Sequence, residues 1–382
     1  MNYDGATKHR DKVIKTLTSG VAMLFDKNKI DYIEGFGSVT DDANVKIGGQ
    51  FDGTEIQTDR VVLACGSVAK PILGLEFGGR VLDTAGMWLL NELPARLCVI
   101  GAGASGTEIA SALGRLGTSV TLVEALDQIL PLEEPEIAKA CAREIAKQNV
   151  KIETGAKVED VSPSDSSVSV TINGSAEEFD YLVIAAGRGP DVEGLGLDEA
   201  GVEMDDRGLV KVDGRLRTSR EGVWAIGDMV PGPALAHKAS DEGIIAVEDA
   251  AGNETHPIDY SYVPAVTFCY PQVASFGLTE AEAKEAGHDV VVGKVPMGAV
   301  GAPTVYGDRG GMVKIVGDRQ YGELLGASIV SVKAADLIQE LVNARELEGG
   351  YPEVARMIHA HPSFAEAVME AARATDGWLI HG

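Results

Sequence analysis

The sequence is poor in cysteine, with only four among its 382 residues. These are Cys65, Cys98, Cys141 and Cys269, and no two of them are close enough along the chain to form a CxxC pattern. Disulfide frameworks and cysteine zinc sites are recognised in a sequence by closely spaced cysteines. Neither kind of site is therefore expected here.

Long apolar runs are also absent, because none approaches the roughly 20 residues that a membrane-spanning helix needs. The N-terminal stretch MNYDGATKHRDKVIK contains no apolar core of a signal peptide. Together these two absences predict a cytoplasmic protein with no membrane partner.

Positive charge is scarce as well, since 33 lysines and arginines stand against 58 aspartates and glutamates, for a net charge of −25. Nucleic-acid binding needs a positive field around the phosphates, so a nucleic-acid partner is not expected. Hydrophobic residues, by contrast, make up 45% of the chain. A chain of this length can then build more than one core, which predicts two or three domains.

Hydrophobic spacing predicts an alternation of helices and strands along most of the chain. Residues 8–30 carry apolar side chains at helical spacing and are predicted to form one amphipathic helix. The run VVLACGS (61–67) predicts a buried strand leading into a glycine turn, and GVWAIGD (222–228) predicts another short strand. Helices are predicted over 135–149 and 234–252. From about Tyr260 the pattern changes to that of an α+β domain.

The stretch GAGASG contains the pattern G-x-G-x-x-G, formed by Gly101, Gly103 and Gly106, between a predicted strand and a predicted helix. The first glycine permits a tight turn, the second lets the backbone approach a pyrophosphate, and the third lets the helix pack against the strand. The free N–H groups of the helix then face the phosphates. Glu124 ends the second strand, where a carboxylate can bind the ribose hydroxyls and disfavour a 2′-phosphate. An ordinary tight turn is the alternative, but the full βαβ context favours NAD.

Four stretches together resemble a known family. Residues 101–124 look like its NAD-binding unit, EGVWAIGDMVPGPALAHKASDEGI (221–244) is similar to its second flavin-binding motif, AAGRGP (185–190) resembles the loop that closes its NAD domain, and HAHPSFAEAVMEAA (359–372) resembles its C-terminal catalytic motif. The chain thus resembles the flavin disulfide oxidoreductases, class I of the pyridine nucleotide-disulfide oxidoreductases, and within them the dihydrolipoamide dehydrogenases.

The resemblance implies an α/β fold with Rossmann-like FAD- and NAD(P)-binding domains and a C-terminal α+β dimerisation domain. It implies that Asp228 binds the ribityl chain of FAD. The other residues that it places near the flavin are Gly37, Cys65, Gly66, Ser67, Ala234, Leu235, Ala236 and His237. The residues that it places around NAD are Gly101, Gly103, Gly106, Glu108, Glu124, Val158 and Gly187.

The stretch HAHPSFAE (359–366) contains two histidines, a proline and a glutamate. An imidazole titrates near neutrality, so His361 can take a proton from a dithiol, and Glu366 can fix its tautomer. On spacing alone, a histidine in a capping turn with Pro362 as the first helical residue is the preferred interpretation. The resemblance reverses that preference, makes His361 and Glu366 catalytic, implies a cis His361–Pro362 bond, and leaves His359 a structural role. A metal site at the two histidines is not expected, because further ligands are lacking nearby.

The family also has a glycine-rich turn for the ADP half of FAD and a C-x-x-x-x-C redox pair, and residues 1–382 contain neither. We therefore expect a chain shortened at its N-terminus, which by itself binds NADH, is nearly colourless, and does not oxidise dihydrolipoamide at an enzymatic rate. The expected segments are a flavin-domain remnant (1–82), an NAD-binding domain (83–208), a returning flavin segment (209–258) and an interface domain (259–382).

The resemblance implies a homodimer that oxidises dihydrolipoamide with NAD through FAD, on the lipoyl domain of a 2-oxoacid dehydrogenase complex. Two alternatives remain open at this point. One is another flavin-dependent NADH oxidoreductase of the same superfamily, which the missing cysteine pair favours. The other is a non-catalytic NAD-binding fragment that dimerises.

Overall fold

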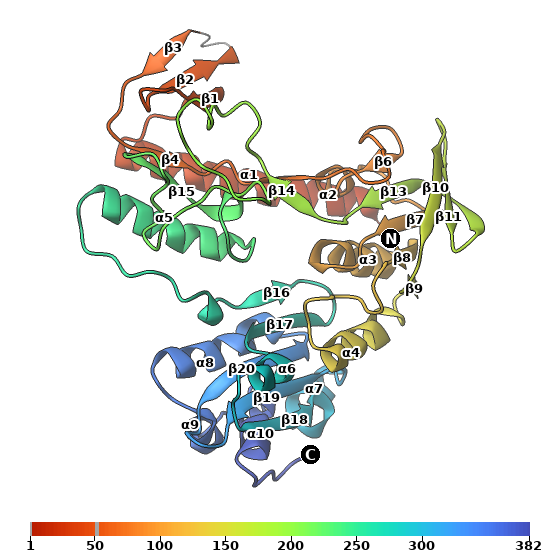
Figure 1. Cartoon of the computed structure of the whole chain (residues 1–382). Coiled ribbons are helices and arrows are strands. Elements are labelled where there is room, and N and C mark those ends of the chain that lie inside the picture. The colour runs from red at the N-terminus through yellow and green to blue at the C-terminus, as the bar shows by residue number, and fades with distance from the viewer. Residues whose placement is uncertain (1, 50–52) are drawn as a thin grey trace. The chain divides into compact units, whose positions relative to one another are not determined.

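The computed structural model describes residues 2–49 and 53–382 (Figure 1). The chain forms two compact units, and each is assembled from stretches that are separate in sequence. One unit contains residues 71–187 and 261–382, and the other contains residues 2–70 and 188–260. The division into four segments expected from the sequence is finer than this and stays a prediction.

A five-stranded parallel sheet organises the first part of the larger unit, with the strand order β6-β13-β7-β8-β9. Its elements are β6 (Val81–Leu82), α2 (Thr84–Trp88), β7 (Arg96–Ile100), α3 (Ala104–Leu116), β8 (Ser119–Val123), α4 (Pro135–Ile145), β9 (Val150–Glu153) and β13 (Tyr181–Ile184). Strands β7 and β8 are buried after their first residue, because both faces of a parallel sheet are covered. Leu97 and Val99 face α3 and α4, whereas Cys98 and Ile100 face the other side.

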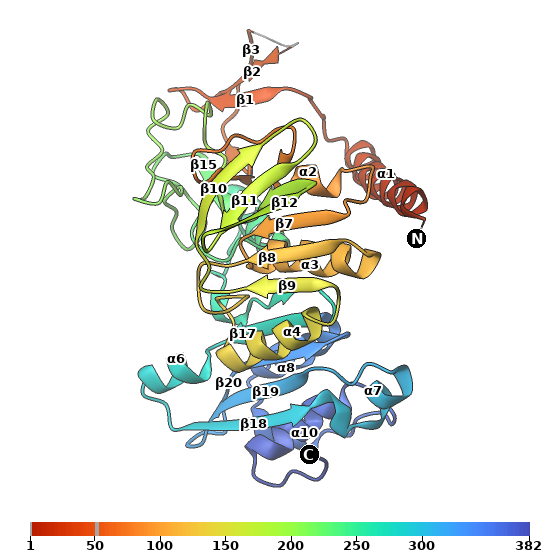
Figure 2. The same ribbon diagram turned by 90° about the vertical axis from the view of Figure 1, so that its right-hand side faces the viewer.

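That other side is covered by a three-stranded antiparallel sheet formed by β10 (Val158–Pro163), β11 (Val168–Ile172) and β12 (Ser175–Phe179). Residues 168–172 read VSVTI, and their burial alternates as period-2 spacing requires. Figure 2 shows β7, β8 and β9 side by side, with α4 following below β9. The parallel sheet is thus held between helices and a second sheet.

The C-terminal part of the larger unit is a five-stranded antiparallel sheet with the order β16-β17-β20-β19-β18. Helices α8 and α10 pack on this sheet through one apolar cluster, and α4 contacts β20. The elements are β16 (Ala265–Thr267), β17 (Gln272–Gly277), α6 (Glu280–Glu285), β18 (Val290–Pro296), α7 (Gly301–Tyr306), β19 (Met312–Asp318), β20 (Leu324–Ser331), α8 (Ala334–Glu346), α9 (Tyr351–Arg356) and α10 (Glu366–Thr375). This is the α+β pattern that the sequence predicted for the region.

The smaller unit is built from short strands and two long helices. Strand β4 pairs in parallel with β15, β5 pairs antiparallel with β14, and β1, β2 and β3 form an antiparallel sheet. The elements are α1 (Tyr3–Asn28), β1 (Phe36–Val39), β2 (Val45–Gly48), β3 (Thr54–Ile56), β4 (Val61–Leu63), β5 (Ser67–Ala69), β14 (Arg188–Pro190), β15 (Val223–Ala225) and α5 (Ala236–Ala250).

Several predicted boundaries were wrong. The buried strand predicted within 61–67 ends at Leu63 and leads into the predicted glycine turn, where Gly66 has a φ of +76°, but a second strand that was not predicted begins at Ser67. The helix predicted over 135–149 ends at Ile145, where Lys147 and Gln148 turn tightly and Asn149 takes a positive φ. The helix predicted over 8–30 spans Tyr3–Asn28, and its apolar face is exposed, with Leu17 at 66%.

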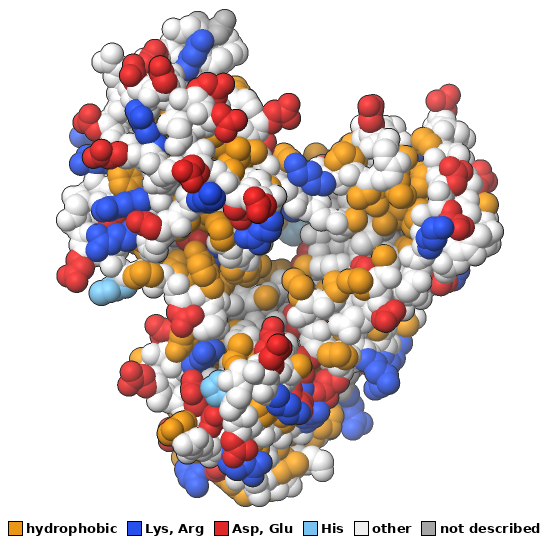
Figure 3. All heavy atoms as spheres, viewed as in Figure 1, with side chains coloured by type: hydrophobic (Ala, Val, Ile, Leu, Met, Phe, Trp, Pro, Cys, Tyr) orange, Lys and Arg blue, Asp and Glu red, His pale blue; other side chains and the backbone are white. Residues whose placement is uncertain are grey.

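On the face shown in Figure 3, acidic and basic side chains are interspersed. The excess of acidic residues is therefore not gathered into one patch on that face. Within the described residues, none of the helices combines the length and the hydropathy that crossing a bilayer requires.

Candidate functional site

The glycine-rich turn lies between β7 and α3, and each glycine has a separate steric reason. Gly101 adopts a φ of +97°, and a Cβ there would come within 2.6 Å of the Ala185 carbonyl oxygen. A Cβ on Gly106 would stand 1.8 Å from the Gly101 oxygen, so only glycine lets α3 pack this close. A Cβ on Gly103 would meet no protein atom within 4 Å. That open side is where a pyrophosphate could approach the helix N-terminus.

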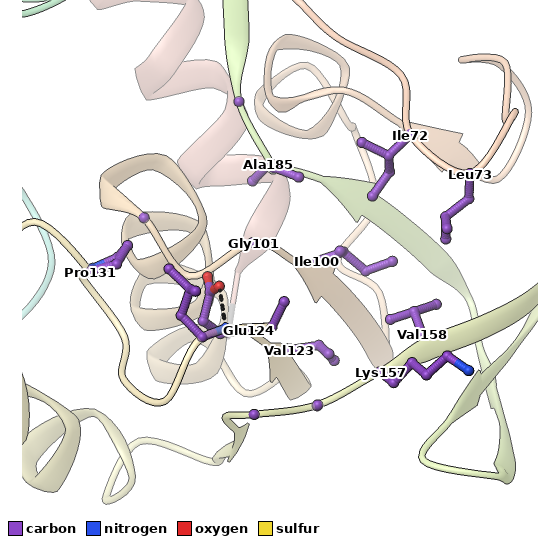
Figure 4. Close-up of a pocket in the computed structure, with 17 residues that line it drawn as sticks. Ile72, Leu73, Ile100, Gly101, Val123, Glu124, Pro131, Lys157, Val158 and Ala185 are labelled. Carbon is purple, nitrogen blue, oxygen red and sulfur yellow. Dashed lines mark hydrogen bonds between the residues drawn. The ribbon is translucent and has the colours of Figure 1, made fainter.

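Beside this turn lies a cavity of about 780 Å³ (Figure 4). Five of the residues predicted to bind NAD line it, namely Gly101, Gly103, Glu124, Val158 and Gly187. Figure 4 shows Val158 and Lys157 on one side, with Ile72 and Leu73 facing them from a separate segment. Ile72 and Leu73 carry no motif, so the sequence did not identify these two apolar residues as part of the site. An apolar cleft with a few polar groups is typical of cofactor sites.

Two residues that were predicted to bind NAD do not line this cavity. Gly106 lies beneath the turn and acts through packing. Glu108 is directed elsewhere, because its Oε1 accepts a hydrogen bond of 2.8 Å from the Phe268 amide. Burial raises the pKa of the Glu108 carboxyl above its ordinary value, against the effect of that hydrogen bond. A direct contact of Glu108 with NAD stays a prediction.

The Glu124 carboxylate is fixed by the backbone around the cavity. Its Oε2 accepts from the Ala102 amide at 2.8 Å, and its Oε1 accepts from the Leu126 amide at 3.0 Å. The residue is 9% exposed and belongs to the cavity lining. An ionised carboxylate has about four acceptor positions, so each oxygen can still accept a ribose hydroxyl. The site therefore fits a nucleotide with two free ribose hydroxyls.

This geometry predicts that NADH binds at least about 10-fold more tightly than NADPH, because a 2′-phosphate would lie against the fixed Glu124 carboxylate. Titrating both reduced nucleotides by their fluorescence measures the two affinities. Glu124→Gln removes the negative charge while keeping the size of the side chain, so it should reduce the difference between the affinities for NADH and NADPH. Equal or tighter binding of NADPH to the unchanged protein would contradict the prediction.

The residues predicted to lie near the flavin meet in the smaller unit. The Ser67 hydroxyl donates to Asp228 Oδ2 at 2.5 Å, and Arg188 Nε donates to the same hydroxyl at 2.8 Å. Arg188 also donates to the Ser67 carbonyl oxygen. The sequence did not identify Arg188, although it belongs to the AAGRGP stretch. This chain of contacts fixes the orientation of the Asp228 carboxylate.

Two buried charged side chains of α5 hold the backbone next to Asp228. Glu242 Oε2 accepts from the Gly227 amide at 2.7 Å, and Lys238 Nζ donates to the Gly227 carbonyl oxygen at 2.8 Å. Lys238 and Glu242 pair at 2.9 Å with both side chains 0% exposed, and Tyr260 donates to Glu242 at 2.6 Å. A buried ion pair is tolerated only when its remaining hydrogen-bonding groups are satisfied. Here those groups are satisfied by the Gly227 peptide, so the pair positions the turn that carries Asp228.

The other residues predicted to lie near the flavin are also in the smaller unit, but their local environments differ. Cys65 is exposed, and its amide contacts Met229 Sδ at 3.1 Å. Gly37 lies in β1 opposite Ile47, and no hydrogen bond between described residues joins it to Ser67 or Asp228. Ala234 and Leu235 precede helix α5, which begins at Ala236 and has no side-chain cap hydrogen bond at its N-terminus. Ser67, Asp228 and the start of α5 thus fit the polyol and ring of a flavin, whereas a role of Gly37 near the flavin stays a prediction.

In the C-terminal segment, His361 and Glu366 form a bonded pair. His361 Nδ1 lies 2.8 Å from Glu366 Oε1, and Glu366 Oε2 accepts from the Ser363 amide at 2.8 Å. The His361 side chain is 76% exposed, whereas that of Glu366 is 15% exposed. Burial disfavours ionisation of Glu366, but the Ser363 amide and the His361 ring outweigh it and hold the pKa of the carboxyl below its ordinary value. With Nδ1 engaged by an anion, Nε2 is the nitrogen left to exchange a proton.

The local structure around this pair differs from the expectation in one respect. Pro362 does not begin a helix, because α10 starts at Glu366 and residues 361–364 bend before it. The His361–Pro362 bond is cis, as predicted. His359 is nearly buried, with Nε2 at 2.6 Å from Glu340 Oε1, and this carboxylate raises the pKa of the His359 ring above its usual value despite burial. Those contacts agree with a structural role for His359.

Comparison with known proteins gives the family directly. Residues 1–243 match the family described as pyridine nucleotide-disulphide oxidoreductase, and residues 263–372 match its dimerisation domain. The chain belongs to this family, as the sequence predicted. It is an oxidoreductase of the type that uses FAD and a pyridine nucleotide, and its fold has the Rossmann-like and dimerisation parts expected.

Similar proteins extend over nearly the whole chain. Dihydrolipoyl dehydrogenase of Bacillus subtilis is 39% identical over 388 residues, covering 100% of this chain and 82% of that protein. The mitochondrial dihydrolipoyl dehydrogenase of Pisum sativum is 37% identical, covering 97% of this chain and 76% of that protein. Among solved structures, the HOCl-induced flavoprotein disulfide reductase RclA from Escherichia coli superposes with a TM-score of 0.89 at 28% identity, covering 97% of this chain and 86% of that one.

Proposed function

We propose that this chain supplies the acid–base pair and the nucleotide site of a dihydrolipoyl dehydrogenase, which oxidises dihydrolipoamide with NAD and has the lipoyl domain of a 2-oxoacid dehydrogenase complex as its partner. The observation that carries the proposal is the exposed His361 ring, bonded through Nδ1 to the partly buried Glu366. Dithiol oxidation needs a base that removes a proton, since the thiolate is the reactive form of sulfur. Relatives named dihydrolipoyl dehydrogenase at 36–39% identity support the choice of substrate.

In this proposal each group on the chain has one task. His361 Nε2 takes a proton from a substrate thiol and later returns it, while the Glu366 carboxylate stabilises the imidazolium. Asp228, oriented by Ser67 and the Gly227 backbone, binds the ribityl hydroxyls. Gly103 and Glu124 hold the pyrophosphate and ribose of the nucleotide. FAD, when bound, supplies the electron transfer between the dithiol and the nicotinamide.

The assay is NADH formation from dihydrolipoamide and NAD, followed by absorbance. Residues 1–382 contain no C-x-x-x-x-C pattern, so the chain is joined to the N-terminal segment of a relative that carries one, with residues 1–382 alone as the comparison. We expect lipoamide-dependent NADH formation in the joined protein. If that protein retains flavin and NADH yet shows no dithiol oxidation, the proposed substrate is wrong.

A second candidate is a flavin-dependent reductase with a different acceptor. A leghemoglobin reductase of Glycine max is 37% identical over 96% of this chain, and the Escherichia coli relative is named a disulfide reductase. NADH oxidation with lipoamide, with other disulfides and with ferric haem protein as acceptors separates these possibilities. A preference for a non-disulfide acceptor would favour the second candidate.

The matching dimerisation domain supports a homodimer. Large apolar side chains are exposed near His361, as expected for a surface that a second subunit covers. Ile358 is 100% exposed, and Tyr306, whose ring packs against Phe364, is 72% exposed. We predict a dimer by analytical ultracentrifugation at micromolar concentration, because burying such apolar side chains stabilises association. A folded protein that sediments only as a monomer would contradict this. The cytoplasmic location and the absence of a nucleic-acid partner stay predictions.

Removing the Asp228 carboxylate is expected to weaken FAD binding about 10- to 100-fold, the size of one lost hydrogen bond to a charged group. The variant is Asp228→Ala in the joined protein, and flavin fluorescence during titration measures its affinity for FAD. Asp205→Ala is a matched control, since Asp205 serves an exposed turn in the same unit. NADH binding should not change in either variant. Unaltered FAD affinity in Asp228→Ala would remove Asp228 from the site.

A further inference from the structure

The fold brings together two buried cysteines that are 128 residues apart in sequence. Cys141 lies in α4, and Cys269 lies in the turn between β16 and β17. Their sulfur atoms are 3.8 Å apart, and the residues are 0% and 4% exposed. Both belong to the apolar cluster beneath the parallel sheet, and both are free thiols. No spacing pattern in the sequence predicts that they meet.

Residues 96–153, the stretch from β7 to β9 that we call the nucleotide-binding segment, hold the turn that carries Cys269 by hydrogen bonds on both sides of the cysteine. Its Phe268 amide donates to Glu108 of α3 at 2.8 Å, and its Tyr270 amide donates to Ser111 of α3 at 3.0 Å. Gln148, just beyond α4, donates to the Tyr270 carbonyl oxygen. Three side chains of the nucleotide-binding segment therefore fix the backbone on both sides of Cys269.

Helix α4, which carries Cys141, is fixed independently at its N-terminus. Lys314 of β19 is 2% exposed at its side chain and forms ion pairs with Glu134, Glu136 and Glu280. Glu134 is the residue that precedes α4. The backbones that carry the two thiols are therefore both anchored by contacts outside the cysteine pair.

We propose that Cys141 and Cys269 are a latent disulfide site, which a peroxide oxidises to a covalent link between α4 and the β16–β17 turn. One sulfur attacks a peroxide oxygen and becomes a sulfenic acid as the O–O bond breaks and water leaves. The second sulfur then displaces the hydroxyl group as a second water, and the S–S bond forms. The two thiols lose two electrons and two protons in total, and one hydrogen peroxide becomes two waters. The sulfurs must close from 3.8 Å to about 2.05 Å.

Burial of the two thiols makes this oxidation slow and restricts it to small oxidants. Contact with Cys269 and burial both raise the pKa of the Cys141 thiol, so little reactive thiolate is present near neutral pH. A peroxide is small enough to reach the pair during local opening, whereas bulky thiol reagents should reach the exposed Cys65 first. The link would join the nucleotide-binding segment to the region that matches the dimerisation domain. None of this depends on the proposed substrate.

The test uses the folded full chain with hydrogen peroxide as the probe. After oxidation, remaining thiols are alkylated under denaturing conditions, and the digested protein is analysed by mass spectrometry without reduction. We expect a peptide pair joined through Cys141 and Cys269, which dithiothreitol separates. The oxidised protein should also melt several degrees higher than the reduced one, because a link across 128 residues restricts the unfolded chain.

Controls within the chain separate this site from general oxidation. Cys98 is fully buried in β7 on the other side of the parallel sheet, where burial raises the pKa of its thiol to about 12, and it should be recovered as a free thiol. Cys65→Ser should leave the linked peptide unchanged, whereas Cys141→Ala and Cys269→Ala should each abolish it. Recovery of both Cys141 and Cys269 as alkylated thiols, under conditions that oxidise Cys65, would overturn the proposal. So would a link that forms only in urea-unfolded protein.

Discussion

The His361→Gln variant is expected to oxidise dihydrolipoamide about 100- to 10,000-fold more slowly than the unchanged protein, the usual contribution of a general acid–base group. Glutamine occupies a similar space but cannot exchange a proton near neutral pH. The comparison is made by NADH formation in the joined protein described above. Binding of FAD and NADH should be unaffected, because the residues predicted to hold them are other ones.

Two companion variants sharpen this result. Glu366→Gln should also lower the rate, because an amide can turn its N–H toward Nδ1 and favour the wrong tautomer. His9→Gln is the matched control, since His9 lies exposed on α1. A joined protein in which His361→Gln retains more than about half of the rate would exclude His361 as the acid–base group.

The Gly106→Ala variant is expected to lose at least about 100-fold in NADH affinity and to melt at a lower temperature. Its new Cβ would stand 1.8 Å from the Gly101 carbonyl oxygen. That oxygen belongs to the backbone and cannot turn aside like a side chain, so α3 must move away from β7. The turn that faces the cavity would then lose its shape. NADH fluorescence and thermal unfolding measure the two effects.

Two other glycines provide contrasting outcomes. Gly103→Ala adds a Cβ that meets no protein atom within 4 Å, so it should weaken NADH binding without lowering the melting temperature. Gly20→Ala in α1 also adds a Cβ in open space; it should leave NADH binding unchanged and should not lower the melting temperature, because alanine favours a helix interior over glycine. Tight NADH binding in Gly106→Ala would show that the close approach of α3 is unnecessary for the site.

The sequence by itself determined the features that depend on short stretches of chain. The glycines at 101, 103 and 106 could be assigned from their spacing, because a tight βα turn is made within six residues and its steric demands are local. The same holds for His361 and Glu366, whose contact spans five residues. These positions also carry the resemblance that gave the family. The sequence did not predict the start of α10 at Glu366, because several neighbouring residues can begin a helix with similar energies.

The tertiary structure alone decided the contacts between distant segments. Arg188 reaches Ser67 across 121 residues, and Ser67 reaches Asp228 across 161. Lys238 and Glu242 are four residues apart on α5, but their burial against Gly227 could not be read from that spacing. Cys141 and Cys269 met only because α4 and the β16–β17 turn pack in one cluster. The physical reason is the same in each case: local sterics and hydrogen bonds are fixed by neighbouring residues, whereas packing depends on which surfaces the whole fold brings together.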